Sequence, residues 1–269
     1  MKCPTYSSWF RERRLDAVCQ ILRLPAVMLS QIPGIGPVVK AASTTVGQKI
    51  LMAITGLLLC GFLVTHLAGN LLLYAGAKQF NHYAESLHSW GILLNVAEVG
   101  LFTLFMAHIG LACSTHAMNR QARRSQYTQK ESKQEPMALP SGGASGWMFV
   151  TGVIIAFFLV VHITDMRLKK NPFIDYSPAY QNGPEAGPDE FVAVRLVLTN
   201  WTAIAYVIGL LALGIHLSHG FRSALQTLGV NHPRWNRLLE IISLLFAWTI
   251  TLGFLSLVTW AAMTSGTSN

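Results

Sequence analysis

Five long apolar runs dominate this chain of 269 residues and constrain its fold more than any other feature. A helix needs about 20 consecutive apolar residues to cross the hydrocarbon core of a bilayer. We place the runs at 47–75, 92–118, 146–166, 196–222 and 238–263. Only 12% of the residues are charged, whereas soluble domains carry roughly 25%. The sequence therefore predicts an all-α membrane protein built as a bundle of five transmembrane helices.

The polar segments between the runs are too short for a soluble domain, which needs at least about 50 residues. We therefore predict one transmembrane domain over 46–263, followed by a short outer tail over 264–269. Residues 1–45 are predicted to be a cytoplasmic extension at the membrane interface. They do not read as a signal peptide, because Arg23 and Pro25 interrupt their apolar stretch and no small-residue cleavage site follows.

The basic residues predict the orientation of the bundle. Fifteen of the 20 Lys and Arg residues fall in the segments 1–49, 120–133 and 222–237, which lie on one side of the membrane if the five runs alternate in direction. Cytoplasmic segments carry the excess of Lys and Arg, so the amino terminus is expected in the cytoplasm. The net charge of +8 is then a signal of topology and of contact with anionic lipid, and nucleic acid is not expected as a partner.

Four histidines lie inside four different apolar runs: His66, His108, His162 and His216. An ionisable side chain in hydrocarbon is costly unless a partner satisfies it, so each is a candidate functional residue. Counted from the ends of the runs, His66 and His162 share the outer half of the membrane, and His108 and His216 share the inner half. We call these two sets the outer pair and the inner pair.

Two imidazoles on facing helices are the ligand set of a bis-histidine haem, with one neutral ring on each side of the porphyrin. The sequence therefore predicts two haems b, one in each pair, bound without covalent attachment because the four cysteines form no CxxCH pattern. Zinc is disfavoured, since no thiolate cluster and no carboxylate are expected near these positions. A single intramembrane histidine could equally serve helix packing or a proton relay.

The only repeat we detect is loose: the first and second runs together supply one outer and one inner histidine, and so do the third and fourth runs.

The residues around these histidines resemble a known family. The strings Thr65-His66-Leu67, Met106-Ala107-His108-Ile109, Val160-Val161-His162 and His216-Leu217-Ser218-His219-Gly220 are similar to the cytochrome b subunit of bacterial succinate:quinone oxidoreductases, the complex II enzymes. The outer Phe80-Asn81-x-Tyr83 and the opening Gly47-Gln48-Lys49-Ile50-Leu51-Met52 resemble the single-chain, two-haem b558-type members. The resemblance covers residues 44–263 and leaves the first 40 residues unmatched.

The resemblance implies that His66 and His162 hold the outer haem and that His108 and His216 hold the inner haem. It also implies a multi-pass protein of the bacterial cytoplasmic membrane. A flavoprotein and an iron–sulfur subunit would dock on its cytoplasmic face, and a quinone, expected to be menaquinone, would react near the outer face. The chain would be the subunit of succinate dehydrogenase or fumarate reductase that binds no dicarboxylate. Quinone oxidation or reduction would be its only chemistry.

Further side chains are candidates for a role beside the four ligands. Glu98, His82 and His88 lie toward the outer face and are candidate proton carriers at a quinone site, although His82 and His88 also fit a solvated helix face. The residues near the inner border that could bind haem propionates are Gln48, Lys49, Trp147, Arg222 and His219. Lys49 and Arg222 are also placed where long basic side chains reach out to the membrane surface. His219 is a competitor of His216 as the inner ligand.

Two alternative functions remain open at this point. A two-haem cytochrome b of a hydrogenase or formate dehydrogenase would share the ligands and differ in its soluble partner. A transporter with a histidine proton relay would bind no haem and would be colourless when purified. No run has a central Pro or Gly pair, which the discontinuous helices of such transporters commonly show.

Overall fold

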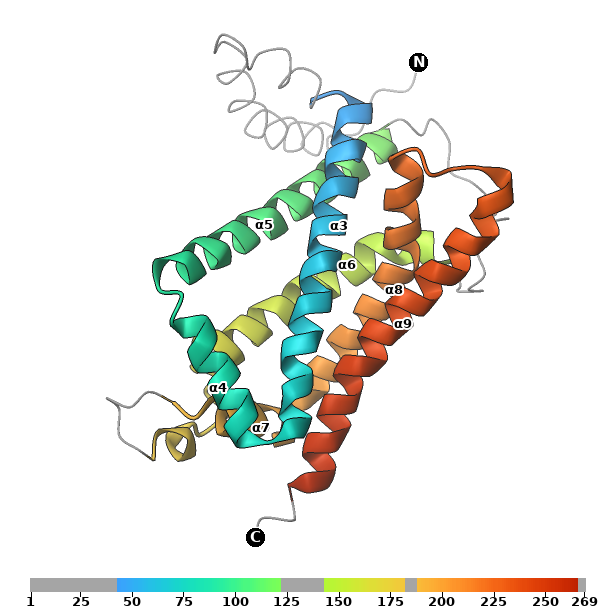
Figure 1. The fold of residues 1–269 in the computed structure, drawn as a ribbon. Helices are drawn as coiled ribbons and strands as arrows, with labels where there is room; N and C mark the ends of the chain where they lie inside the picture. The colour runs from blue at the N-terminus through green and yellow to red at the C-terminus, as the bar shows by residue number, and fades with distance from the viewer. Residues whose placement is uncertain (1–42, 122–142, 182–187, 266–269) are drawn as a thin grey trace, which may run out of the picture. The chain divides into compact units, whose positions relative to one another are not determined.

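The computed structural model describes residues 43–121, 143–181 and 188–265, and within these ranges the chain is helical with no strand (Figure 1). The predicted extension over 1–45 and the inner loop after the second run lie almost entirely outside the described residues. The elements are α3 (Thr45–Asn70), η1 (Leu71–Ala75), α4 (Ala77–His88), α5 (Ile92–Gln121), α6 (Gly143–His162), η2 (Ile163–Arg167), η3 (Ser177–Tyr180), α7 (Glu190–Thr199), α8 (Ala203–Thr227) and α9 (Pro233–Thr264).

Five of these helices are long and apolar enough to cross a membrane, which confirms the predicted all-α, multi-pass membrane fold. The candidate spans are Thr45–Ala75, Ile92–Arg120, Gly146–Arg167, Ala203–Thr227 and Pro233–Thr264. The first, second and third spans agree with the predicted runs to within two residues. The fifth span ends one residue after its predicted run and begins five residues before it. The chain divides into two units, Met1–Leu51 and Met52–Asn269, and the packing described below is that of the second unit.

The predicted fourth run, 196–222, is wrong at both ends. Its first residues belong to the separate short helix α7, and α8 continues to Thr227. The break lies at Asn200, which has an extended backbone (φ −76°, ψ 154°). Its Oδ1 accepts a hydrogen bond from the Thr202 amide at 3.1 Å, and its Nδ2 donates to the Phe173 carbonyl at 3.1 Å. The hydrogen bonds of the asparagine side chain replace bonds that a continuous helix would make, and a hydropathy pattern does not reveal them.

Close helix packing is concentrated between α6 and α8 and between α8 and α9. Glycines on α8 allow this approach, as small residues do in membrane bundles. A Cβ at Gly209 would overlap the ring of Phe158 on α6, and a Cβ at Gly214 would lie 2.7 Å from Oγ1 of Thr251 on α9. The helix α5 packs far less closely against the rest of the unit.

One end of the bundle carries the short helices α4 and α7, together with the ends of α3, α6 and α9 (Figure 1). The predicted interfacial helix over 80–88 is helical and forms most of α4. Asn81 of α4 joins it to α7: its Nδ2 donates to Asp189 Oδ1 at 3.0 Å, and its Oδ1 accepts from the Phe191 amide at 3.0 Å. Asp189 also caps α7 through the Val192 amide at 3.0 Å.

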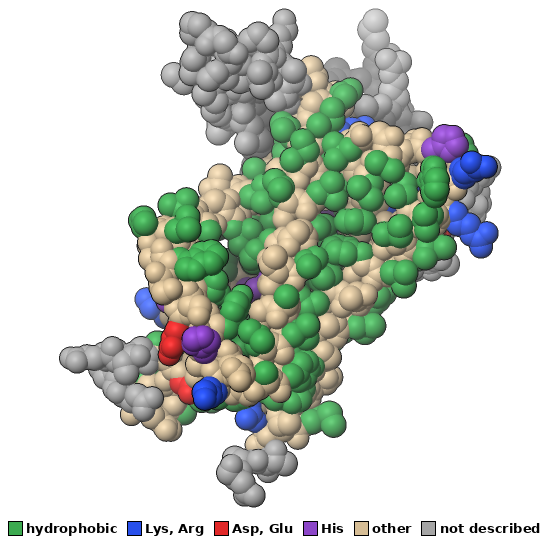
Figure 2. All heavy atoms as spheres, viewed as in Figure 1, with side chains coloured by type: hydrophobic (Ala, Val, Ile, Leu, Met, Phe, Trp, Pro, Cys, Tyr) green, Lys and Arg blue, Asp and Glu red, His purple; other side chains and the backbone are tan. Residues whose placement is uncertain are grey.

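The surface of the helices matches a lipid environment. Hydrophobic side chains cover the visible lengths of the helices, and charged side chains gather toward their ends (Figure 2). The helix α5 is the most exposed, and no residue of its most apolar window is buried. Large apolar side chains such as Val99, Phe102 and Met106 therefore face outward along it.

Candidate functional site

The four intramembrane histidines come from four helices and lie in two pairs. The rings of His66 (α3) and His162 (α6) have centroids 5.8 Å apart and planes at 87°. His108 (α5) and His216 (α8) lie close enough to interact electrostatically. All four side chains are partly buried. The structure therefore brings together the same two pairs that depth along the helices predicted.

The spacing of the outer pair suits two ligands of one metal ion. Two imidazoles on opposite sides of a metal, each with a metal–nitrogen bond of about 2 Å, have ring centres about 6 Å apart. The observed 5.8 Å between His66 and His162 is close to this value. Within the described ranges, no three His, Cys, Asp or Glu side chains gather in a way that could hold a metal ion alone. Each pair can thus supply two protein ligands to a metal ion, but not a complete protein ligand set within these ranges.

Aromatic rings surround the outer pair. The ring of Phe62 stacks on His66 at 5.2 Å, and Phe158, one helical turn before His162, lies 5.7 Å from that ring. The ring of Tyr206 contacts His162 edge-on at 5.9 Å. The lining of the outer pair is therefore mainly aromatic and apolar.

The ring nitrogens of the outer pair have few protein partners. Nδ2 of Asn70 lies 3.5 Å from Nδ1 of His66, and that amide also donates to the His66 carbonyl at 2.8 Å. Nδ1 of His162 is buried, and no residue in the described part of the chain gives it a hydrogen bond. Buried polar atoms are normally satisfied, so an unsatisfied one at a candidate site points to a ligand.

The inner pair is held by threonines. Oγ1 of Thr55 on α3 lies 3.1 Å from Nδ1 of His108, and Oγ1 of Thr151 on α6 lies 3.2 Å from Nδ1 of His216. A glycine follows each threonine. A Cβ at Gly56 would lie 3.3 Å from Cε1 of His108, and a Cβ at Gly152 would lie 3.6 Å from Cε1 of His216.

These contacts reveal a repeat that sequence reasoning missed. Residues 52–66 and 148–162 both read Met-x-x-Thr-Gly-x9-His, and Phe62 and Phe158 match within the repeat. The repeat is visible in the sequence once the two segments are aligned 96 residues apart. The sequence analysis noted only a loose repeat in the positions of the histidines, whereas α3 and α6 share this defined motif.

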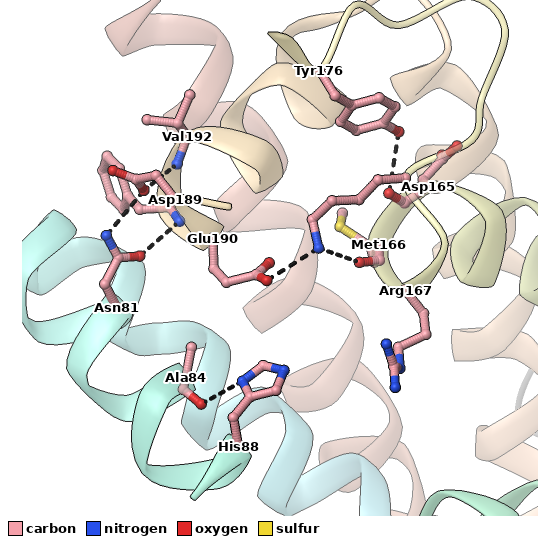
Figure 3. A network of polar contacts seen from close by, with 12 residues as sticks. Asn81, Ala84, His88, Asp165, Met166, Arg167, Tyr176, Asp189, Glu190 and Val192 are labelled. Atoms are coloured by element: carbon pink, nitrogen blue, oxygen red, sulfur yellow. Dashed lines mark hydrogen bonds and ion pairs between the residues drawn. The ribbon is translucent and has the colours of Figure 1, made fainter. Parts of the chain in front are cut away.

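Asp165 is a second feature that the sequence analysis missed. The expectation that no carboxylate lies near the histidines is wrong, because Asp165 follows His162 by three residues in the π-helical turn η2 and is only 1% exposed. Its Oδ1 accepts from Asn171 Nδ2 at 2.7 Å and its Oδ2 from the Tyr206 hydroxyl at 3.0 Å. The hydroxyl of Tyr176 donates to the Asp165 carbonyl at 3.1 Å (Figure 3).

Asp165 connects the segment that follows η2 to the bundle and to the outer pair. Asn171 and Tyr176 belong to the segment after η2, whereas Tyr206 is on α8 and contacts the ring of His162. Burial and, secondarily, the charge of Asp165 raise the pKa of Tyr176 to about 12. The tyrosine therefore remains a neutral donor at physiological pH.

The predicted quinone and proton residues lie at the α4–α7 end, where each has different surroundings. Glu98 forms a two-point ion pair with Arg167, at 3.1 and 3.2 Å, and both side chains are largely exposed. His88 donates from Nδ1 to the Ala84 carbonyl at 2.8 Å (Figure 3). His82 is exposed on α4. No contact links these three side chains to the histidine pairs in the described ranges.

The predicted propionate partners differ in their surroundings. Arg222 lies 3.4 Å from Glu240 and is mostly buried, so an acidic neighbour already balances its charge. His219 is close enough to His216 to interact with it electrostatically. The backbone carbonyl of Trp147 accepts a hydrogen bond from Thr151.

Gln48 and Lys49, the remaining propionate candidates, lie in the first turn of α3 and belong to the first unit. Gln48 Nε2 donates to the Ser43 carbonyl at 3.5 Å. The side chain of Lys49 is exposed, as expected for a basic residue at a helix end.

Comparison of the chain with protein-family models, with curated proteins and with solved structures found no match. The chemistry of the site is therefore inferred from its own residues and their geometry.

Proposed function

We propose that this chain is a membrane electron-transfer subunit that binds two haems b, one between His66 and His162 and one between His108 and His216. The observation that carries the proposal is the pairing of four intramembrane histidines, two by two, while no group of three His, Cys, Asp or Glu side chains in the described ranges could hold a metal ion. A porphyrin supplies four of the six ligands of iron, and two imidazoles complete the set. Bound haem would supply a one-electron carrier at each pair.

The chain's own residues would orient the ligands and exclude water. Phe62, Phe158 and Phe254 surround the outer pair with apolar surface, and Phe254 lies 5.6 Å from the ring of His66. Thr55 and Thr151 contact Nδ1 of His108 and His216, the two imidazoles of the inner pair. A dry, rigid setting of this kind reduces solvent reorganisation when charge moves.

The family resemblance extends the proposal to a partner and a substrate. The chain would be the cytochrome b subunit of a bacterial succinate dehydrogenase or fumarate reductase in the cytoplasmic membrane. Its flavoprotein and iron–sulfur subunits would dock on the basic cytoplasmic face. Electrons would pass between the iron–sulfur subunit and a membrane quinone, proposed to be menaquinone, through the two haem sites. Quinone oxidation or reduction would be the only reaction on this chain.

The proposal is tested first by a reduced-minus-oxidised optical spectrum of the purified complex, with pyridine haemochrome quantitation per chain. We expect two low-spin haems b per chain. His66→Ala should remove one haem and leave the other. His82→Ala is the matched control, because His82 is exposed on α4 and outside both pairs. A complex without haem would refute the proposal.

The electron donor distinguishes the candidate partners. Reduction of the haems by succinate would support a complex II enzyme. Reduction by hydrogen or formate, with no response to succinate, would instead identify the two-haem cytochrome of a hydrogenase or formate dehydrogenase.

A further inference from the structure

The repeat on α3 and α6 gives both inner histidines the same support. Each threonine of the repeat contacts Nδ1 of the inner histidine on the following membrane-spanning helix. Each also precedes the outer histidine on its own helix by eleven residues. Eleven residues make about three helical turns, so the threonine and the outer histidine share one face of the helix. One face of each helix thus supports an inner ligand and presents an outer one.

The hydroxyls of Thr55 and Thr151 also have acceptors on their own helices. Oγ1 of Thr55 donates to the Met52 carbonyl at 3.1 Å. Oγ1 of Thr151 donates to the Trp147 and Met148 carbonyls at 2.9 and 3.1 Å. A hydroxyl has a single hydrogen, so while that hydrogen is directed to these carbonyls, each oxygen accepts from the imidazole Nδ1–H.

Backbone carbonyls supply a second acceptor to the same rings. The Met52 carbonyl lies close enough to His108, and the Met148 carbonyl close enough to His216, to act as an acceptor. Carbonyl oxygens never donate, so the hydrogen must again come from the ring. An acceptor at Nδ1 keeps the ring hydrogen in place there and leaves the lone pair on Nε2.

We propose that Thr55 and Thr151 are positioning residues that fix the Nδ1–H tautomer and the ring orientation of His108 and His216. The two copies of Met-x-x-Thr-Gly-x9-His would then be equivalent half-sites, each supporting one inner ligand and contributing one outer ligand. The inference rests on the proposed function, because haem iron is the ligand that Nε2 would bind. Partners of this kind orient the ligating ring and raise its basicity.

The inference predicts a selective defect in the inner site. Thr55→Val and Thr151→Val keep the shape of the side chain and remove the acceptor. Loss of such a partner typically weakens metal binding by about 10–100-fold. We expect this loss of haem affinity at the inner site only. For the fraction of haem still bound at the inner site, we expect a higher midpoint potential, because a less basic imidazole stabilises ferric iron less.

The experiment is an optical redox titration of both haems in the purified complex, combined with haem quantitation per chain. Thr55→Ser and Thr151→Ser retain the hydroxyl and should restore both haem content and potential. Thr103→Val on α5 is the control, because its exposed hydroxyl donates to the Val99 carbonyl of its own helix.

The outcomes separate this inference from the proposed function. Two haems per chain with unchanged potentials in both valine variants would refute the positioning role and leave the function intact. An equal change at both haems would also refute it, because the threonines contact the inner pair alone. Absence of haem from the wild-type complex would refute the function and the inference together.

Discussion

Asp165 is a buried carboxylate whose hydrogen bonds join three segments of the chain. Both its oxygens and its carbonyl are acceptors, and the donors are Asn171, Tyr176 and Tyr206. Such a network is stable only while every member is satisfied, because an unpaired buried polar group costs about 1–3 kcal/mol. Since Tyr206 also contacts His162, a change at Asp165 should reach the outer pair.

Replacing Asp165 tests this connection. Asp165→Ala leaves the Tyr206 hydroxyl and the Asn171 amide without their acceptor, so we expect a loss of about 2 kcal/mol or more in stability. Thermal unfolding in detergent measures the change, and the outer haem should be lost before the inner one. Asp175→Ala is the control, because Asp175 is exposed and bonds only to Ser177 within the described ranges. Equal stability of the two variants would contradict the prediction.

Tyr176 should make the stability of the segment after η2 depend on pH in the alkaline range. Its pKa is raised from 10.0 to about 12, because burial and the charge of Asp165 disfavour the tyrosinate. The contribution is therefore complete below about pH 10 and is lost as the pH rises through about 12. We expect wild-type protein to lose stability across this window more steeply than Tyr176→Phe. Parallel curves for the two proteins would exclude this role.

Gly56 should be sensitive to the addition of a single methyl group. A Cβ there would lie 3.3 Å from Cε1 of His108 and would press on the ring that Thr55 holds. We expect Gly56→Ala to lower the haem content of the inner site by shifting this ligand. Gly61→Ala on the same helix is the control, because a Cβ at Gly61 meets nothing within 4 Å. Haem quantitation per chain measures both, and full content in Gly56→Ala would show that the ring can move.

At the scale of the elements, the boundary between α7 and α8 depends on one side chain. Asn200 turns the chain between the two helices by bonding to the Thr202 amide and the Phe173 carbonyl. The helix α8 starts after this turn, and its other end lies five residues beyond the end of the predicted apolar run. His216 lies eleven residues before the end of α8, and His108 lies twelve before the end of its span. The two inner ligands are therefore more closely matched in depth than the sequence indicated.

Asn200→Ala should weaken this boundary. The substitution removes two hydrogen bonds, each worth about 1 kcal/mol, and lets the backbone of the turn compete with a continuous helix. We expect a loss of about 1–2 kcal/mol, measured by thermal unfolding in detergent. Asn95→Ala serves as the control, because Asn95 is exposed in the first turn of α5. A similar loss in both variants would mean that the Asn200 side chain does not hold the turn.

At the scale of the whole molecule, the charge distribution predicts which end of the bundle faces the cytoplasm. The α4–α7 end should lie outside the cytoplasm, and the turn between α8 and α9 should lie inside. Ser89 and Asn231 are exposed residues near these two places. Introducing a cysteine at each position, in a chain whose four native cysteines are replaced, allows labelling with a membrane-impermeant thiol reagent.

We expect Ser89→Cys to react in intact cells and Asn231→Cys to react only after the membrane is opened. The reverse pattern would invert the orientation and move the proposed docking face to the α4–α7 end. The cysteine-free parent protein is the control for background labelling.

Much of the fold could be predicted from the sequence because the bilayer imposes it locally. The thickness of the hydrocarbon core sets the length of each apolar run, so four spans were placed to within a few residues. The four histidines were recognisable for the same reason, since an ionisable residue within such a run is rare and costly. Direction along alternating helices was sufficient to sort them into the two pairs that the structure brings together.

The remaining features depend on how each helix is rotated and on contacts between distant residues. Asn200 ends a helix through the carbonyl of Phe173, 27 residues away, and Thr55 meets His108 across 53 residues. From the sequence alone, Asp165 resembles a polar residue at a membrane border, and only the structure shows that Tyr206 and Asn171 donate hydrogen bonds to it. Hydropathy and depth by themselves determined the spans and the candidate ligands. Only the tertiary structure decided what supports those ligands, because hydrogen bonds form between atoms that the fold, and not the local sequence, brings within about 3 Å.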